Sequence, residues 1–372
     1  MAWSPQQEQA IKAVKAWLAD PSAPQVFRLF GFAGSGKTTL AVHLAADVPG
    51  LVLFGCYTGK ASLVMRKKGC HNAMTLHSMI YKPKQDELTG KLHFSWNPDS
   101  DACWASLIVV DEVSQVDGKM ADDLLRYGRK VLVLGDPAQL PPVSGTGFFI
   151  NAEPDFMLTE VHRQAADNPI IRMSMDVREG RGLKPGTYGE SQVLLRGSIG
   201  REALRERVLA ADQVLCGINR TRTSLNGRIR ELKGIKGDPV GWLPAVGERL
   251  VCLRNNREKN LFNGGMWETQ RVETYDKYVE MRVKSLDEEG MSPVDVATLR
   301  CFFDGTDKDL DWRVKMGWDE FTYGWALSVH KSQGSQWNDV LLYDESEVFR
   351  EDARKHLYTA ITRAAERVTV LM

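Results

Sequence analysis

The sequence predicts an α/β protein with two parallel-sheet lobes, a small β-hairpin insertion and a β-barrel insertion. Strand-like and helix-like segments alternate in two parts of the chain, which is typical of doubly wound parallel sheets. Two stretches, residues 81–104 and 244–317, break this alternation. The chain has 372 residues, which is more than one ordinary core needs and favours several lobes.

The first lobe is expected at residues 1–80 and 105–153. Short apolar runs predict its strands, and amphipathic runs after turn residues predict its helices. The expected strands are 25–30, 51–57, 107–110 and 130–134, and the expected helices are 37–47, 61–68 and 120–127.

The second lobe is expected at residues 154–243 and 318–372, where the same alternation returns. Its expected strands are 213–218, 340–343 and 368–371, and its expected helices are 221–233 and 356–366. The interruption in sequence implies that a second module is inserted into this lobe.

The two insertions have different patterns. Residues 81–104 are polar and contain Leu88–Lys91, a hairpin-like turn. Residues 244–317 contain β-like runs at 249–254, 268–274 and 278–283. Short strands at this spacing suggest a small barrel.

Composition excludes several classes of protein. Apolar residues make up 43% and charged residues 26%, and 48 basic residues balance 48 acidic ones. This mixture is globular and rules out a polycation. No apolar run is long enough to span a membrane, and the first residues lack the pattern of a secretory signal. The six cysteines form no C-x-x-C pair, so we expect buried thiols in a reducing, cytoplasmic compartment.

A phosphate-binding loop is the most specific local motif. Residues Gly31–Thr38 fit G-x-x-x-x-G-K-[ST] between a predicted strand and a predicted helix. Lys37 is expected to reach the β- and γ-phosphates, and the Thr38 hydroxyl to bind Mg²⁺. The residues expected to bind the nucleotide in this loop are Gly34, Ser35, Gly36, Lys37, Thr38 and Thr39.

An acidic pair follows the apolar strand at 107–110. Asp111 is expected to hold Mg²⁺, and Glu112 to act as the general base on the attacking water. With the phosphate loop, these acids predict hydrolysis of a nucleoside triphosphate.

The remaining motifs select among families that share this loop. Gly135–Pro142, Leu158–Gln164, Val329–Gly334 and Tyr358–Ala364 follow in that order. Together they resemble superfamily 1 helicases, and most closely the RecD-like group of superfamily 1B, which includes the small phage Dda-type enzymes. The resemblance runs from about Ser4 to Leu371. It implies that the lobes are RecA-like and that the barrel is SH3-like.

The resemblance also implies roles around ATP. Gln7 would read the adenine edge, and Gln139 would couple the γ-phosphate to the DNA track. Arg163 and Arg363 would reach the γ-phosphate, where planar guanidinium groups stabilise the charge of the transition state. The Gly334 amide would meet the same phosphate. Both arginines belong to the second predicted lobe, so ATP is expected to bind between the lobes.

A nucleic-acid track is implied by the same family likeness. The residues expected to contact it are Thr58, Lys60, Thr75, His77, His330 and Lys331. A translocating motor should hold the backbone rather than the base edges, and these residue types suit phosphates. In the hairpin insertion, Phe94 or Trp96 is expected to stack on the last base pair; the alternative is that both rings pack the hairpin onto the first lobe.

The leading functional prediction is an ATP-dependent DNA helicase. The resemblance implies translocation 5′-to-3′ on single-stranded DNA and unwinding of tailed duplexes. It also suggests replication or recombination partners in a bacterial or phage-infected cell. One chain holds both expected sides of the ATP cleft, so we expect that a monomer can be functional. Alternatives are an RNA helicase and a DNA-stimulated ATPase that remodels protein–DNA complexes without unwinding. A small-molecule phosphotransferase would leave the later motifs unexplained. The basic stretch at 201–234 is either a solvated helix face or a phosphate-facing stripe.

Overall fold

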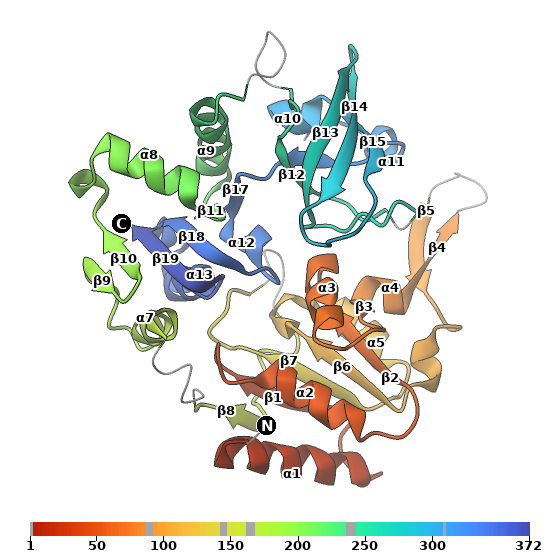
Figure 1. The fold of residues 1–372 in the computed structure, drawn as a ribbon. Helices are drawn as coiled ribbons and strands as arrows, with labels where there is room; N and C mark the ends of the chain where they lie inside the picture. Colours follow the sequence, from red (N-terminus) through yellow and green to blue (C-terminus); the bar gives the residue numbers. More distant parts are fainter. Residues whose placement is uncertain are drawn as a thin grey trace. The chain divides into compact units, whose positions relative to one another are not determined.

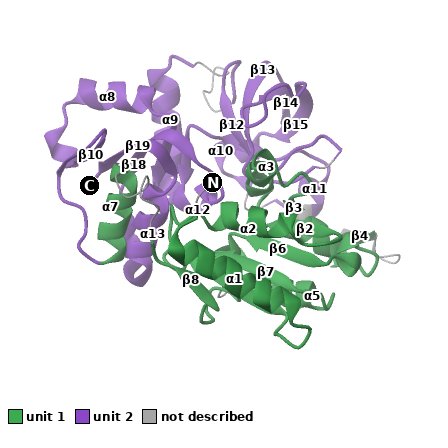
Figure 2. Ribbon diagram, turned by 60° about the horizontal axis from the view of Figure 1, so that its bottom comes forward, with its two compact units in different colours: residues 1–179 green, residues 180–372 purple. Residues whose placement is uncertain are grey.

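The computed structural model describes residues 3–85, 92–141, 147–160, 168–235, 243–256, 258–307 and 310–372. The chain divides into two compact units, residues 1–179 and 180–372 (Figure 2). The expected turn at Leu88–Lys91 and the predicted site residue Arg163 lie outside the described residues.

A six-stranded sheet forms the centre of the first unit, and its strand order is β3-β2-β6-β7-β1-β8. All five pairings are parallel, and neighbouring strands are visible side by side in Figure 1. The strands are β1 (Val26–Gly31), β2 (Val52–Cys56), β3 (Met74–Thr75), β6 (Leu107–Asp111), β7 (Val131–Gly135) and β8 (Phe156–Leu158).

The helices of this unit are α1 (Pro5–Ala19), α2 (Lys37–Ala46), α3 (Gly59–Lys67), α4 (Leu76–Ile80), α5 (Gly118–Leu125) and α7 (Pro169–Arg178). Short 3₁₀ turns, η1 (Asp101–Trp104) and η2 (Val113–Gln115), flank β6.

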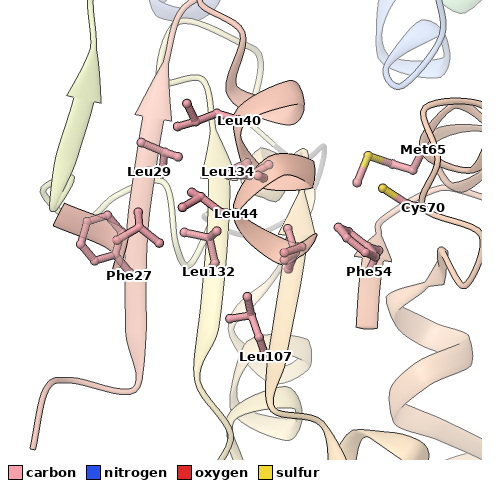
Figure 3. Close-up of a cluster of buried hydrophobic side chains, with 14 of the residues drawn as sticks. Phe27, Leu29, Leu40, Leu44, Phe54, Met65, Cys70, Leu107, Leu132 and Leu134 are labelled. Atoms are coloured by element: carbon pink, nitrogen blue, oxygen red, sulfur yellow. The ribbon is translucent and has the colours of Figure 1, made fainter. Parts of the chain in front are cut away.

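Helices cover both faces of the first sheet. Val109 packs into the cluster that includes Leu40 and Leu44 of α2, whereas Ile108 packs into the cluster that includes Leu124 of α5. Figure 3 shows the first of these clusters, where side chains of β1, β6 and β7 meet those of α2. Burial on both faces explains why β6 is a continuous apolar run instead of an alternating one.

Helix α1 begins at a well-capped end. The Ser4 hydroxyl accepts a hydrogen bond from the Gln7 backbone amide, the Gln7 side-chain oxygen accepts one from the Ser4 backbone amide, and Pro5 occupies the first helical position. This reciprocal arrangement satisfies two backbone donors that a helix start otherwise leaves unpaired. It also turns the Gln7 side chain inward, to 5% exposure.

A two-stranded hairpin, β4 (Tyr81–Gln85) and β5 (Leu92–Trp96), extends from the first unit. The Trp96 indole donates to the Asp123 carbonyl at 3.0 Å, and its ring lies 5.1 Å from that of Tyr127. These contacts fasten the base of the hairpin to α5 and to the residues that follow it.

The second unit contains a six-stranded sheet of order β17-β11-β18-β19-β10-β9. It is parallel except for the edge strand β9, which runs antiparallel to β10. The strands are β9 (Gly186–Tyr188), β10 (Ser191–Leu194), β11 (Gln213–Cys216), β17 (Ala326–Ser328), β18 (Trp337–Tyr343) and β19 (Ala364–Leu371). The helices are α8 (Arg201–Ala210), α9 (Asn219–Leu232), α12 (Val329–Ser332) and α13 (Ala353–Ile361), with 3₁₀ turns η3 (Arg196–Ser198) and η5 (Ser346–Asp352).

An antiparallel five-stranded sheet of order β15-β14-β13-β12-β16 stands where the barrel is predicted. Its elements are β12 (Arg249–Cys252), β13 (Met266–Thr274), β14 (Tyr278–Ser285), β15 (Val294–Leu299) and β16 (Phe321–Tyr323), with α10 (Cys301–Asp304) and α11 (Trp312–Met316). Between the described strands, no pairing joins β15 to β16 into a closed barrel. The SH3-like assignment therefore stays a prediction.

A buried ion pair ties this antiparallel sheet to α9. Arg230 donates to Glu248 at 2.9 Å, and the Trp325 indole donates to the other carboxylate oxygen at 2.6 Å. The Arg230 guanidinium also lies 4.2 Å from the centre of the Tyr323 ring. A buried carboxylate needs such partners, because burial alone raises the pKa of Glu248 while Arg230 opposes that rise.

The structure ends one predicted helix earlier than the sequence suggests. The helix expected at 356–366 is α13, which ends at Ile361, and β19 already begins at Ala364. The reason is that Ala364 pairs with Trp337 of β18, which draws these residues into the sheet. The predicted start of the second lobe at residue 154 stays a prediction; β8 pairs with β1, and the compact units divide after Glu179.

Among the described helices, none combines the length and the apolar character needed to cross a membrane.

Candidate nucleotide and nucleic-acid site

The predicted phosphate loop connects β1 to α2. Gly34 and Gly36 adopt left-handed backbone angles, with φ of +80° and +81°. A side chain at Gly36 would also approach the Gln7 amide nitrogen to 2.8 Å. Only glycine accepts this conformation without strain, so the two glycines define the path of the loop.

Lys37 begins α2, and its ammonium lies against the loop backbone. It donates to the Gly31 carbonyl at 2.5 Å and to the Phe32 carbonyl at 3.0 Å. A cation held by carbonyls alone has no opposite charge in these contacts. The arrangement therefore leaves Lys37 able to exchange these acceptors for the oxygens of an anion.

Ser35 supplies an independent test of this loop as an anion site. Its side chain is 2% exposed, and its hydroxyl has no hydrogen-bond partner among the described residues. A buried hydroxyl without a partner is costly, and a bound oxyanion would satisfy it. The donor set of the loop thus fits a phosphate chain.

The predicted metal ligands are adjacent in space. The Thr38 hydroxyl donates to an Asp111 carboxylate oxygen at 2.9 Å, although the two residues are far apart in sequence. The second Asp111 oxygen accepts from the Glu112 amide at 2.8 Å. A hydroxyl and a carboxylate in contact are oxygen donors of the kind that Mg²⁺ prefers. Among the described residues, no cluster of three or more acidic, histidine or cysteine side chains forms an all-protein metal site.

Glu112 occupies a strained position at the end of β6. Its φ and ψ are 55° and 46°, a left-handed conformation that is uncommon for residues other than glycine. Such strain persists only where the surroundings fix it, and it concentrates at functional sites. This observation agrees with the role predicted for Glu112.

Gln7 contacts the loop, as its predicted role requires. Its amide nitrogen donates to the Ser35 carbonyl at 3.0 Å. The neighbouring Gln6, which the sequence does not single out, accepts from the amides of Thr159 and Glu160 at 3.0 and 2.8 Å. Gln6 thus joins α1 to the segment after β8, and its place beside Gln7 was the only signal available.

Arg178 is a second residue that the sequence does not reveal. Its guanidinium lies 3.6 Å from the centre of the Phe32 ring in the phosphate loop. A planar cation on an aromatic face is attractive, but nothing in a local motif marks the pair.

Gln139 follows β7 in a loop organised by Asp136. The Asp136 side chain is 3% exposed and accepts from the Ala138 amide at 3.0 Å, and the Gln139 amide donates to the Asp136 carbonyl. Because β6 and β7 are parallel neighbours, Asp111 and Gln139 follow strands that end at the same edge of the sheet.

The first group of predicted nucleic-acid residues follows β2 and β3 at this edge. Thr58 caps α3 by accepting from the Ala61 amide, and Thr75 caps α4 by accepting from the Ser78 amide, both at 3.1 Å. Lys60 is 6% exposed, so in this conformation its side chain is not presented to solvent as a phosphate contact would require.

The hairpin separates the two aromatic candidates. Trp96 is half-buried and fastened to α5, as described above, and the Arg126 guanidinium lies 4.5 Å from its ring. Phe94 is 55% exposed and meets the His77 ring edge-on at 4.4 Å. Phe94, and not Trp96, therefore offers an apolar surface to a ligand.

The second unit holds the other predicted contacts. His330 and Lys331 belong to α12, which follows β17. Burial lowers the pKa of His330. The Lys331 side chain is exposed overall, yet the surrounding protein desolvates its ammonium and Arg222 lies near, and together they lower the pKa of Lys331 to about 8. A bound phosphate would raise the pKa of Lys331, because a nearby anion favours the charged form of the ammonium.

Arg363 lies close to Gly334, because its guanidinium contacts Ser335, the next residue in the chain. Gly334 has a left-handed φ of +74°. Arg363 is 6% exposed, and its guanidinium donates to the carbonyls of Thr359 and Ser335 at 3.1 and 3.3 Å. The side chain is thus positioned by α13 and by the residue after Gly334.

The basic stretch at 201–234 is not a uniform stripe. Arg205 and Arg228 pair with acids one turn away, at 3.4 and 2.8 Å, and Arg230 is the buried partner of Glu248. The exposed pairs of Arg205 and Arg228 favour the solvated-face interpretation for these two residues, whereas Arg230 is buried.

Taken together, a parallel sheet, a second sheet that is parallel except at its edge strand β9, and a phosphate loop with its acidic partner define a P-loop protein with two sheet units. An AAA domain model matches residues 3–194, and a UvrD-like helicase C-terminal domain model matches residues 323–371. The chain belongs to the AAA domain family.

Curated relatives resemble most of this chain. The chain is 29% identical over 365 residues to the ATP-dependent RecD2 DNA helicase of Deinococcus radiodurans, covering 91% of this chain and 46% of that protein. It is 26% identical over 388 residues to the conjugal transfer protein TraA of Agrobacterium fabrum, covering 95% of this chain and 31% of TraA. The chain therefore spans less than half the length of these relatives.

Solved structures share the fold. Bacteroides Pif1 bound to single-stranded DNA aligns with a TM-score of 0.59 at 15% identity, covering 99% of this chain and 92% of that one. Candida albicans Pif1 aligns with a TM-score of 0.56 at 19% identity, covering 100% and 94%. At these identities the likeness concerns the fold alone, and it supports the prediction of RecA-like lobes.

Proposed function

We propose that this chain is an ATP-dependent DNA helicase motor that translocates on single-stranded DNA and separates the duplex ahead of it. One observation carries the proposal. The predicted helicase motifs of the first unit follow strands β1, β2, β3, β6 and β7, which all end at one edge of a parallel sheet. Ligands of open α/β sheets bind at this edge.

In this proposal, the first unit holds the triphosphate of ATP. The loop residues Gly34–Thr39 surround the phosphates, Lys37 exchanges its carbonyl acceptors for phosphate oxygens, and Gln7 lies beside the loop to read the adenine. Thr38 and Asp111 would hold Mg²⁺, which neutralises phosphate charge when it is bound. Glu112 orients the attacking water and accepts its proton.

Hydrolysis is proposed to need arginines that come later in the chain. Arg163 and Arg363 would stabilise the charge that spreads over the γ-phosphate oxygens. The Gly334 amide would contact the same phosphate, and Gln139 would couple it to the nucleic-acid track. A ligand that interacts differently with the open and closed arrangements of two units can drive their relative motion.

The nucleic-acid track is proposed along Thr58, Thr75 and His77 of the first unit and His330 and Lys331 of the second. These groups suit the phosphate backbone and carry no sequence preference. Lys60 would need to change conformation to join them. The names of the relatives support DNA: RecD2 is a DNA helicase, and a Bacteroides Pif1 is bound to single-stranded DNA.

Polarity, a monomeric active form and a role in replication or recombination follow from family likeness alone, and so they are part of the proposal. The cytoplasmic location stays a prediction.

The test is ATP-dependent unwinding of a short DNA duplex that carries one single-stranded tail. We expect opening with a 5′ tail and no opening with a 3′ tail. Opening only with the 3′ tail would reverse the polarity and keep the helicase. Hydrolysis stimulated by DNA without opening of either substrate would indicate a remodelling ATPase, and stronger stimulation by a matched RNA strand would indicate an RNA helicase.

A further inference from the structure

Three neighbouring aromatic rings in the second unit lie between α12 and α13, and we call them the stack. Phe349 and His356 are stacked on each other, whereas the His330 ring is tilted against both, by 46° and 56°. The ring of Phe349 lies parallel to that of His356, with centres 4.1 Å apart and planes at 14°. The His330 ring lies 5.5 Å from Phe349 and 6.2 Å from His356. His330 comes from α12, Phe349 from η5 and His356 from α13, so the stack connects three elements.

His356 contributes to this stack as a ring and not through hydrogen bonds. The side chain is fully buried, and neither ring nitrogen has a hydrogen-bond partner among the described residues. Burial, helped by the charge of His330, lowers the pKa of His356 to about 3. The imidazole is therefore neutral, and packing against Phe349 is what holds it.

Phe349 is fastened from its own side of the stack. Glu345, at the start of the same segment, accepts from the amides of Gly217 and Ile218 at 2.9 and 3.1 Å. A side chain at Gly217 would come within 3.0 Å of the Phe349 ring.

The backbone of Arg350, the residue after Phe349, is strained, which also indicates that the segment is held in place. Arg350 has φ of 49° and ψ of −109°, a conformation that costs energy for any residue with a side chain. Strain of this kind persists only where surrounding contacts fix the segment, and here the segment carries Phe349.

The stack continues toward the arginine that is proposed to act on ATP. Arg363 lies two residues beyond the end of α13, and its guanidinium donates to the carbonyl of Ser335, three residues beyond α12. The rings therefore lie between the two helices, and this hydrogen bond joins the segments that follow them. A displacement of α12 would therefore change the position of Arg363 through these packed side chains and this hydrogen bond.

We infer that the stack of His330, Phe349 and His356 couples nucleic-acid binding at α12 to the placement of Arg363 for ATP hydrolysis. Phe349 and His356 are positioning residues in this inference, which rests on the proposed function. When the phosphate backbone of the nucleic acid binds His330, it displaces the first ring of the stack. Phe349 passes this change to His356 and to the helix that leads to Arg363, so the strand of DNA selects the hydrolysis-competent arrangement.

The test compares ATP turnover with and without single-stranded DNA in the full chain. Phe349→Leu keeps an apolar side chain but removes the ring, and we expect stimulation by DNA to fall about 10-fold while basal turnover and DNA affinity stay within about 2-fold. His356→Leu should behave in the same way. His356→Phe restores a stackable ring without nitrogens, and it should keep most of the stimulation.

Val348→Ala is the matched control, because Val348 belongs to the same segment and its side chain is 61% exposed. It should leave both activities unchanged. Full stimulation in Phe349→Leu, or lost stimulation in a folded His356→Phe, would overturn the inference. If Phe349→Leu does not fold, the pair at His356 decides. A wild-type chain that DNA does not stimulate at all would instead reject the proposed function.

Discussion

At the scale of single residues, Lys37 is the most direct test of the nucleotide site. Its ammonium donates hydrogen bonds to the loop carbonyls of Gly31 and Phe32. Lys37→Ala removes the charge that the phosphates would meet, and we expect turnover to fall by about 10²- to 10³-fold. Single-stranded DNA should still bind, and phosphate release and fluorescence anisotropy measure the two effects.

Lys15→Ala is the matched control for this change, because Lys15 is an exposed helical lysine that pairs with Asp47 at 2.8 Å. It should not alter turnover. Unchanged turnover in Lys37→Ala would remove the assignment of the phosphate loop.

His356 gives the second prediction at this scale, which concerns pH. The unfolded chain binds a proton at this residue below its ordinary pKa of 6.5, whereas the folded chain stays neutral down to about 3. The unfolded state therefore holds more protons below pH 6.5, and stability falls as the pH drops. The loss at pH 5 from this residue is about 2 kcal/mol.

Denaturant unfolding at pH 7 and pH 5 measures this loss. His356→Phe should be less sensitive to acid than wild type by that amount, and His71→Gln, at an exposed position, should be as sensitive as wild type. Equal acid sensitivity in all three proteins would contradict the burial of a neutral His356.

At the scale of elements, the hairpin divides its two aromatic residues between two tasks. Phe94 is 55% exposed, while Trp96 is half-buried and bonded to the Asp123 carbonyl. Stacking on a base is worth about 1–3 kcal/mol, so Phe94→Ala should lower unwinding by about 10-fold and leave translocation nearly unchanged. Trp96→Ala should instead destabilise the first unit by about 2 kcal/mol.

A tailed-duplex assay, a single-strand translocation assay and denaturant unfolding separate these effects. Equal losses of unwinding and translocation in Phe94→Ala would mean that Phe94 only packs the hairpin. A Trp96→Ala variant with wild-type stability would remove the anchoring role of the indole.

Elements also show how far the sequence predicts the structure. The apolar run at 107–110 and the glycine loop at 31–38 predict β6 and the β1–α2 turn, because burial on both faces and positive φ angles leave direct marks in sequence. The end of α13 was misplaced, since the pairing of Ala364 with Trp337 is a long-range contact that helical periodicity does not reveal. The contact of Arg178 with Phe32 was missed for the same reason.

In the candidate site, too, local sequence signals could be predicted and long-range packing could not. Lys37, Thr38 and Asp111 could be predicted because a phosphate loop and a strand-end acid are local signals. The Thr38 hydroxyl donates to Asp111 at 2.9 Å, and the roles of these residues stay predictions. The burial of Lys60 was not predictable, because a lysine after a strand reads as a surface cation until the packing around it is known.

At the scale of the whole molecule, the proposed chemistry requires residues from both compact units. Lys37 and Glu112 belong to residues 1–179, and Arg363 belongs to residues 180–372. If hydrolysis depends on both units, removing one arginine of the second should spare the binding of a nucleotide that the first unit holds. We expect Arg363→Ala to lower turnover by about 10³-fold while a fluorescent ATP analogue binds within about 3-fold of wild type.

Arg363→Lys discriminates between a charge effect and a geometric one. A lysine keeps the positive charge but lacks the planar fork that serves several oxygens at once, so it should restore little of the turnover. Arg367→Ala is the control, because Arg367 lies in β19 four residues away, pairs with Asp339 at 2.6 Å and is 46% exposed. Normal turnover in a folded Arg363→Ala would show that the first unit hydrolyses ATP without this arginine, and weakened nucleotide binding of the same size as the turnover loss would assign Arg363 to binding instead of catalysis.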